Sequence, residues 1–265
     1  GTFVNNGVLT IENTAAGSSA GSPNGNIEAQ LTVENTAAEF TNNGLITIHN
    51  NASVADTASY TQQAALTVAN GAIFTNTGTI LITGDANKTV AKASLDLGAN
   101  NYTAAAGSLT VLANDAQLKA ASVIINGGTF DGAGEILAAT TVSAGGVLAP
   151  SGTLTLNSLT LDDGGIVNFS ITDGDLLDIT HDLTLSGATL QLTDSALAEG
   201  LYLLANYGDT RTGDALTISG LSDYNYALNF DTPNQVFLNI TIPEPSAWAL
   251  LLTGAALLAV LRRRR

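Results

Sequence analysis

The chain has 265 residues, of which only 12% are charged, and it contains no cysteine and no methionine. The absence of cysteine excludes a disulfide framework, a zinc–thiolate site and a thiol nucleophile. The residues before Pro243 hold 4 basic and 22 acidic side chains, a net charge of 4 − 22 = −18. Such a surface repels phosphate backbones and therefore argues against nucleic-acid binding. Because residue 1 is not methionine, we expect an N-terminal export signal upstream of Gly1.

The first pattern along the chain is an apolar–Thr–apolar unit. It occurs at residues 9–11, 31–33, 46–48, 66–68, 109–111, 154–156, 159–161 and 183–185. A period of two places the two aliphatic side chains on one face of a strand and the threonine on the other. Glycine and asparagine separate these units and tolerate positive φ at tight turns. No segment before Pro243 has a sustained helical period, so the sequence predicts an all-β body.

Part of this body repeats. The segments 1–7, 38–44 and 72–78 each carry a phenylalanine, Phe3, Phe40 and Phe74, at separations of 37 and 34 residues. A recurring strand–turn–strand unit with insertions of variable length predicts a solenoid, here a right-handed parallel β-helix over residues 1–156. We expect Asn42, Asn43 and Asn76 to stack in ladders at its turns. The alternative architecture is a two-sheet β-sandwich.

The middle of the chain supports the same fold by resemblance. The residues Gly127-Gly128-Thr129-Phe130 and the stretch from Gly145 to Leu154 resemble the passenger repeats of autotransporters. Leu176–Thr180 and Gly187–Leu190 continue that pattern. The resemblance implies a β-helix and says nothing about an activity.

Residues 157–241 are less regular, and we expect a β region that caps the solenoid. Strands are predicted at 167–171, 201–205 and 236–242, with polar loops at 209–214 and 221–225. Aromatic side chains concentrate here: Tyr202, Tyr207, Tyr224, Tyr226, Phe230 and Phe237. The favoured interpretation is that they cover the open end of the solenoid, and a carbohydrate-stacking platform is the alternative.

The densest group of acids is Asp173, Asp175, Asp178 and Asp182, beside His181. Carboxylates on a tight turn suit Ca²⁺, so Asp173, Asp175 and Asp178 are a weak calcium candidate. Their spacing matches no EF-hand loop, and acids solvated at a turn are the favoured interpretation. We predict no cofactor and no metal.

The sequence contains few residues that could support catalysis. Parallel β-helices can carry polysaccharide hydrolases or lyases, which need converging carboxylates and often a base. The only bases before Pro243 are Lys88, Lys92, Lys119 and Arg211, and none lies in an acid-rich motif. Two histidines, His49 and His181, leave little for a Ser-His-Asp triad. We therefore predict that the protein is not an enzyme, with a secreted polysaccharide-degrading β-helix enzyme as the alternative function.

The last part of the chain differs in kind. Residues 246–261 are sixteen residues without a charge, and Arg262, Arg263, Arg264 and Arg265 follow at once. As a helix this run spans about 24 Å, somewhat less than a bilayer core of about 30 Å. Snorkelling arginines and an interfacial Trp248 cover part of the difference. The sequence therefore predicts a transmembrane helix with its arginines in the cytoplasm, rather than a buried helix of a soluble domain.

Pro243, Glu244 and Pro245 stand directly before this run and favour an extended peptide. This tripeptide, the apolar run and the arginine cluster together resemble the PEP-CTERM sorting signal of Gram-negative bacteria, over residues 242–265. The resemblance implies that an exosortase-type membrane transpeptidase recognises Pro243, Glu244 and Pro245. It also implies a temporary inner-membrane anchor and a stop-transfer cluster at Arg262–Arg265. The anchor residues would be Trp248, Leu250, Leu251, Leu252, Leu257, Leu258 and Leu261.

These features predict three parts: solenoid repeats at 1–156, a capping β region at 157–241 and a sorting signal at 242–265. The predicted function is that of a non-catalytic, exported protein of the cell surface or extracellular matrix. We expect it to act in adhesion or in association with extracellular polysaccharide in a biofilm. A precursor anchored in the inner membrane, with its N-terminal side outside, would precede release.

Overall fold

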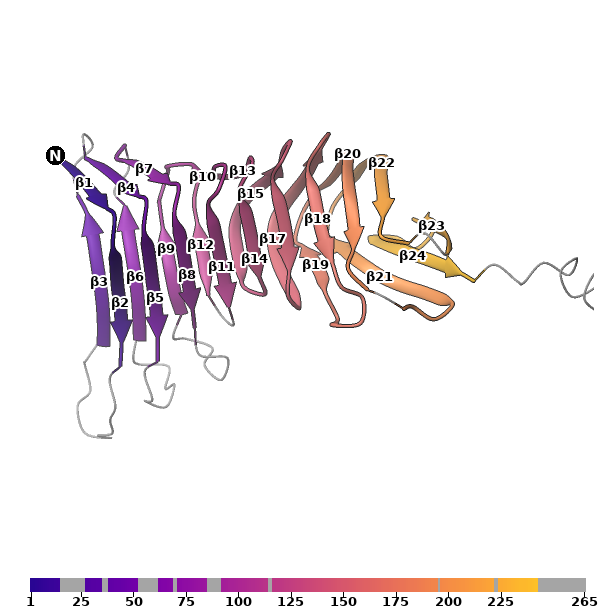
Figure 1. Cartoon of the computed structure of the whole chain (residues 1–265), viewed down its shortest axis with the longest axis horizontal. Helices are drawn as coiled ribbons and strands as arrows, with labels where there is room; N and C mark the ends of the chain where they lie inside the picture. The colour runs from indigo at the N-terminus through magenta and orange to yellow at the C-terminus, as the bar shows by residue number, and fades with distance from the viewer. Residues whose placement is uncertain are drawn as a thin grey trace, which may run out of the picture.

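The computed structural model describes residues 1–14, 27–34, 38–51, 62–68, 71–84, 92–113, 116–194, 196–221 and 224–242. Within these ranges the chain forms 24 β-strands and no helix. The strands follow one another along an elongated body and belong to one continuous hydrogen-bonded sheet (Figure 1). The prediction of an all-β body is confirmed.

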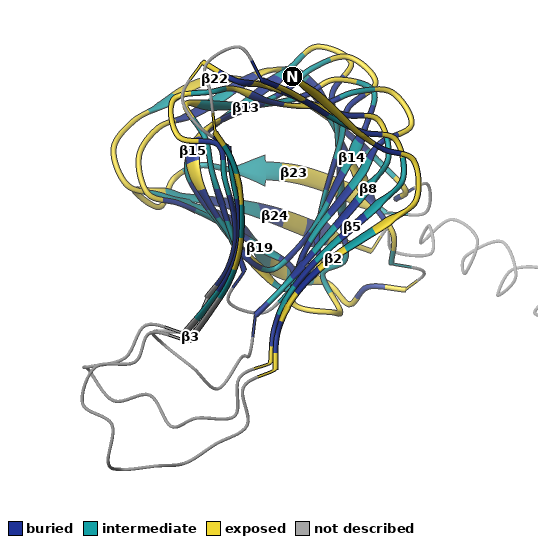
Figure 2. Cartoon of the chain, turned by 90° about the vertical axis from the view of Figure 1, so that its left-hand side faces the viewer, coloured by how far each residue is buried: buried dark blue, intermediate teal, exposed yellow. Residues whose placement is uncertain are grey.

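The strands are arranged in three faces around a shared interior (Figure 2). Each pass of the chain adds one strand to each face, and that strand pairs in parallel with its counterpart in the next pass. A two-sheet sandwich does not fit this pairing, because its neighbouring strands would be antiparallel. The fold is β-helix-like, with a long parallel sheet of many strands.

The first face begins with five short strands and continues in parts of four long ones. They are β1 (Thr2–Asn5), β4 (Glu39–Asn42), β7 (Ile73–Asn76), β10 (Tyr102–Ala104), β13 (Ser122–Ile125), the second halves of β15 (Glu135–Val142) and β17 (Thr153–Asp162), and the first parts of β20 (Leu183–Leu192) and β22 (Arg211–Ser219).

The second face contains β2 (Val8–Asn13), β5 (Leu45–Asn50), β8 (Thr79–Thr83), β11 (Leu109–Ala113), β14 (Thr129–Gly132), β16 (Val147–Pro150), β18 (Ile166–Phe169) and the second parts of β20 and β22. The third face contains β3 (Ile27–Val33), β6 (Gln62–Val68), β9 (Lys92–Asp96), β12 (Gln117–Lys119), the first halves of β15 and β17, β19 (Leu176–Ile179) and β21 (Gly200–Tyr207).

The parallel arrangement ends at one antiparallel unit. The strand β24 (Gln235–Thr241) pairs antiparallel with β21 on one side and with β23 (Asn225–Asn229) on the other. Parallel pairing runs up to this unit through β20 and β22. The boundary expected between residues 156 and 157 falls inside β17, a strand that contributes to two faces.

The predicted repeat is confirmed by the strand register. Phe3 pairs with Phe40 and Phe40 with Phe74. Their rings form a column with centroid separations of 4.9 and 5.4 Å, which Tyr102 extends at 6.2 Å. On the third face Leu31 pairs with Leu66, as the equal phase of the two Leu-Thr-Val units predicts.

The expected asparagine ladders form, and there are two of them. Inside the solenoid, the Asn5 amide donates to Oδ1 of Asn42 and the Asn42 amide to Oδ1 of Asn76, both at 2.8 Å. Outside, the Asn43 amide donates to Oδ1 of Asn6 at 2.9 Å. None of these asparagines has a positive φ, which among described non-glycine residues only Asn234 adopts. The inner asparagines link successive passes and also hold their own turns, because Oδ1 of Asn5 and Oδ1 of Asn76 accept the N–H groups of Gly7 and Gly78.

The apolar–Thr–apolar units mostly point as predicted. In β5, for example, Ile46 and Ile48 are fully buried while Thr47 faces outward. The prediction is wrong in β11, where Thr110 is buried and its two aliphatic neighbours face outward. The register explains the inversion, because Thr110 pairs with the inward Ile80. The buried Thr110 hydroxyl is satisfied by a hydrogen bond with the hydroxyl of Tyr102.

A second correction concerns the polar loop expected at residues 209–214. Residues 211–214 belong to β22, whose first residues Arg211 and Thr212 pair with Leu183 and Thr184. The stretch is mostly exposed, and within the described part of the chain β22 pairs with β20 alone, so it is an edge strand. Polarity alone therefore did not distinguish an exposed strand from a loop.

Candidate functional site

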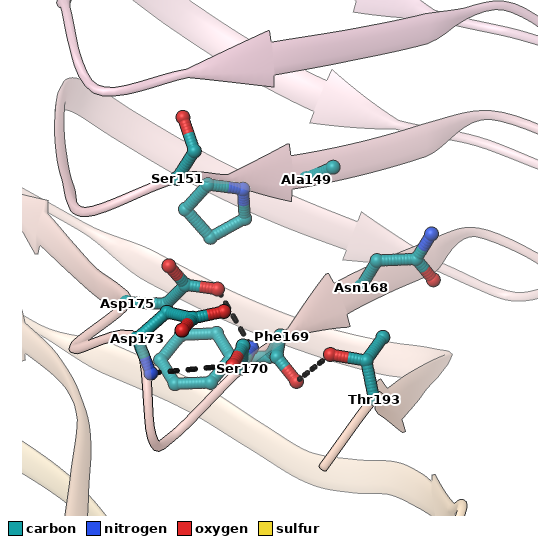
Figure 3. Close-up of a pocket in the computed structure, with 9 residues that line it drawn as sticks. Ala149, Ser151, Asn168, Phe169, Ser170, Asp173, Asp175 and Thr193 are labelled. Carbon is teal, nitrogen blue, oxygen red and sulfur yellow. Dashed lines mark hydrogen bonds between the residues drawn. The ribbon is translucent and has the colours of Figure 1, made fainter.

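Two acids of the cluster singled out in the sequence, Asp173 and Asp175, line an open groove of about 380 Å³ on the outside of the second face (Figure 3). The floor comes from β16 and β18, and one wall comes from the turn after β18. The lining residues are Ala149, Pro150, Ser151, Asn168, Phe169, Ser170, Asp173, Asp175 and Thr193.

Asp175 is the most buried acid of this groove, with 7% of its surface exposed. Its Oδ1 accepts the backbone N–H of Gly152 at 2.9 Å, and its Oδ2 accepts that of Ser170 at 2.6 Å. Burial raises the pKa of Asp175 despite these two donors, and the nearby charges of Asp173 and Asp194 raise it further. The carboxylate therefore joins two successive passes of the chain.

Asp194 holds the same turn from its other side. It accepts the backbone N–H groups of Ile171 and Thr172 at 2.8 and 2.9 Å, and the Thr172 hydroxyl at 2.6 Å. Burial would raise the pKa of Asp194, but hydrogen bonds from Thr172, Ile171 and Ser170 outweigh it, and the net pKa is lowered. The turn at 170–175 is thus clamped between two carboxylates that bind backbone amides.

The remaining acids of the cluster point elsewhere. Asp178 faces outward from β19, in register with Thr155 and Asn206. Asp182 accepts the N–H and the hydroxyl of Thr210, whose hydrogen bonds lower its pKa. Nδ1 of His181 lies 2.8 Å from Oδ2 of Asp209.

The calcium candidate gains no support from this geometry. Asp173, Asp175 and Asp178 do not form a metal-binding group, and no group of three or more His, Asp or Glu side chains suited to a metal occurs among the described residues. Both oxygens of Asp175 are already used by backbone amides. Asp175 and Asp182 act as structural acceptors, whereas Asp178 faces outward from β19.

The basic side chains are engaged away from the groove. Lys119 lies 4.0 Å from Asp96 on the third face. Arg211 donates to the carbonyl of Gly213 and stacks over the ring of Phe230, 4.0 Å from its centroid. Lys88 lies outside the described residues, and the side chain of Lys92 is not described.

Five of the six late aromatic residues make hydrogen bonds or core contacts near the antiparallel unit. The hydroxyl of Tyr202 donates to the carbonyl of Ala198, and that of Tyr226 to the carbonyl of Ile218. Tyr224 accepts the backbone N–H of Leu197 at 3.0 Å. Tyr207 and Phe230 pack against the core. These contacts support the capping interpretation for the residues that make them.

The residues expected to sort and anchor the protein lie outside the described part of the chain. They are Pro243, Glu244, Pro245, Trp248, Leu250, Leu251, Leu252, Leu257, Leu258, Leu261, Arg262, Arg263, Arg264 and Arg265. Among the residues that are described, no helix has the length and apolarity to cross a membrane.

Sequence reasoning missed two acids beside the groove. Asp194 was not grouped with the cluster because it is 19 residues from Asp175 along the chain, yet it binds the same turn. Asp131 pairs with the groove residue Ala149, and burial raises its pKa although Ser151 donates a hydrogen bond to it. Both acids come near the groove through the register between successive passes. The sequence alone does not show that register.

The chain matches no protein-family model, and the search of curated proteins finds no match either.

Proposed function

We propose that this protein is a non-catalytic, exported protein of the cell surface or extracellular matrix, sorted through residues 242–265. The observation that carries the proposal is the succession of Pro243-Glu244-Pro245, the uncharged run at 246–261 and four arginines. In this proposal the run forms a transmembrane helix that anchors the precursor in the inner membrane. An exosortase-type transpeptidase then recognises the tripeptide and releases a right-handed β-helix to the outside.

The geometry of the described residues is compatible with such processing. The strand β24 ends at Thr241, in the antiparallel cap, and Ile242 is 51% exposed. The residue that precedes Pro243 is therefore at the surface and not in the core. A membrane enzyme could reach the peptide that follows without unfolding the solenoid.

The non-catalytic part of the proposal rests on how the acids and bases are used. The buried groove acid Asp175 and the neighbouring Asp194 accept backbone amides, whereas Asp173 is exposed at the rim, and Arg211 is bound to Gly213 and Phe230. A hydrolase or lyase instead needs acids and a base that are free to reach a substrate. A secreted polysaccharide-degrading enzyme remains the second candidate, favoured only by the acidic groove.

The test is a triple substitution of Pro243, Glu244 and Pro245 by alanine, followed by cell fractionation. We expect the altered protein to accumulate as an uncleaved membrane form, while the wild-type body leaves the inner membrane. A matched control replaces Asp231 and Pro233, one acid and one proline of an exposed turn, by alanine. Normal processing of the triple variant would refute the sorting proposal.

Mass spectrometry of the mature C-terminus distinguishes release from permanent anchoring. Release predicts a terminus near residues 243–245, without the arginine cluster. A permanently anchored inner-membrane protein would retain Arg262 to Arg265.

A further inference from the structure

Threonines form a column on the outside of the first face. The register places nine side chains one above the next along the axis of the solenoid: Val4, Thr41, Thr75, Thr103, Ile124, Thr141, Thr160, Thr184 and Thr212. Seven of these nine are threonine. With a strand spacing of about 4.8 Å, the column extends over roughly 38 Å.

The β-propensity of threonine does not by itself explain the column. On the second face, the corresponding outer column contains Val8, Leu45, Thr79, Leu109, Thr129, Val147, Ile166, Thr189 and Thr217. Both columns are exposed strand positions with the same backbone preference. Aliphatic side chains occupy five of the nine positions of the second column, whereas the first column has a hydroxyl at seven of nine.

The seven hydroxyls are available to a ligand. Thr75, Thr103 and Thr212 are exposed, and the other four are partly exposed. Within the described part of the chain none of the seven hydroxyls makes a hydrogen bond, in contrast to the buried Thr110. Seven of the nine passes thus present one free donor and acceptor beside one methyl group, and Val4 and Ile124 present methyl groups alone.

Charge narrows the class of ligand. No member of the column is charged, although the residues before Pro243 carry a net charge of −18. An anionic polymer would be repelled by this body, whereas a neutral polymer meets an uncharged, complementary strip. Extended neutral glycans repeat hydroxyls and C–H groups at about the rise of one pass, so a methyl group at every pass and a hydroxyl at seven of the nine match them.

The column also favours a linear ligand over a surface. The adjoining outer positions of the same face are mixed, with Glu39 and Ile73 in early passes and Ser122, Ala139 and Ser158 in later ones. A two-dimensional lattice such as ice would need a second matched column. A single column of threonines can contact a single linear polymer along its length.

We propose that the threonine column, Thr41, Thr75, Thr103, Thr141, Thr160, Thr184 and Thr212, binds an extended neutral glycan lying along the solenoid axis. The inference rests on the proposed function, because it assigns the site and substrate class of the expected polysaccharide association. Sugar hydroxyls exchange hydrogen bonds with the threonine hydroxyls, and the methyl groups contact C–H groups of the sugar rings.

Affinity gel electrophoresis of the purified full chain in mild detergent tests the proposal, with hydroxyethyl cellulose as the neutral probe and alginate as the anionic one. We expect retardation by hydroxyethyl cellulose and none by alginate. Replacing Thr141, Thr160 and Thr184 together by valine preserves shape and strand preference and removes three hydroxyls. Binding should weaken by about tenfold or more, since each lost hydrogen bond contributes modestly.

The matched control replaces Thr79, Thr129 and Thr189 on the second face by valine and should bind like the wild type. A single Thr103→Arg substitution at an exposed position provides a steric block if the triple variant folds poorly. The proposal would be overturned if the wild type is not retarded, if both triple variants lose binding equally, or if the protein prefers alginate. Binding to ice without binding to the glycan would also overturn it. The assay does not involve processing of the C-terminal segment, so its failure would leave the sorting proposal standing.

Discussion

The early and the late passes of the chain build the same three faces with different interiors. In the early passes, Asn5, Asn42 and Asn76 form a buried amide ladder beside stacked phenylalanine rings. In the late passes, the inward positions of the same face hold Val142, Leu159, Leu161, Leu183 and Leu185. Polar ladders and aliphatic packing are therefore two solutions to one problem, which is keeping successive passes in register.

The two solutions accompany different pass lengths. Successive first-face partners are 37 and 34 residues apart in the early passes. They are 17 apart between Val123 and Thr140, and 19 between Thr140 and Leu159. A longer connection lowers the local constraint on register, because the loop can close in more ways. A directional hydrogen-bond ladder compensates, since an amide pair specifies one register and aliphatic contacts tolerate several.

The largest effect on stability is expected at Asn42. This residue is fully buried and also donates to the carbonyls of Gly44 and Thr79. Asn42→Leu gives this pass a late-type interior and removes one hydrogen-bond partner from the Asn5 amide, from Oδ1 of Asn76 and from the carbonyls of Gly44 and Thr79. The Asn5 amide keeps the carbonyl of Leu45, and Oδ1 of Asn76 keeps the N–H of Gly78. We expect a loss of about 2 to 5 kcal/mol in the free energy of unfolding, measured by urea denaturation.

Replacing Asn5, Asn42 and Asn76 together by leucine sharpens this test. The triple variant should lose less stability than the sum of the three single variants, because no ladder partner is left behind. Additive losses would show that the ladder is a set of independent contacts. The exposed Asn43→Ala substitution is the control and should cost little.

The next largest effect on stability is expected at Gly7, Gly44 and Gly78, which occupy equivalent turns of three successive passes. A Cβ on Gly44 would lie 2.1 Å from the carbonyl oxygen of Gly7, and one on Gly78 would lie 2.2 Å from that of Gly44. Gly44→Ala should therefore cost about 1 to 3 kcal/mol of thermal stability through overpacking. Gly7→Ala is the matched control, because a Cβ there meets nothing within 4 Å. Equal melting temperatures for the two variants would contradict close stacking.

The smallest expected effect is on the pH dependence of stability, to which two acids of the late passes contribute in opposite directions. The pKa of Asp175 is raised by burial, so its contribution to stability is present below the ordinary carboxyl value of 3.8 and is lost as pH rises through the folded-state pKa. The pKa of Asp194 is lowered, so its contribution is present above 3.8 and is lost as pH falls. Comparing wild type with Asp175→Asn and with Asp194→Asn across this range should give differences that change in opposite directions. Parallel changes would contradict the assignment of the two carboxylates.

Much of the architecture was predictable because its signals are local. The period of two at residues 46–48 and the recurring Phe3, Phe40 and Phe74 predicted strands, a repeat and the asparagine ladders. The inward turn of Thr110 was not predictable, because its hydroxyl is satisfied by Tyr102 on a different strand. The strand character of Arg211 to Asp214 was missed for a related reason, since its pairing partner is Leu183 in the preceding pass.

The amino-acid sequence by itself determined the all-β class, the acidic body and the unusual composition of residues 242–265, since these follow from residue types and short spacings. Only the tertiary structure decided which residues of different passes are neighbours. Connections of unequal length separate the partners by anything from 17 to 37 residues, so no fixed spacing in the sequence reveals them. The clamp of Asp175 and Asp194 and the column of threonines exist only once that register is set.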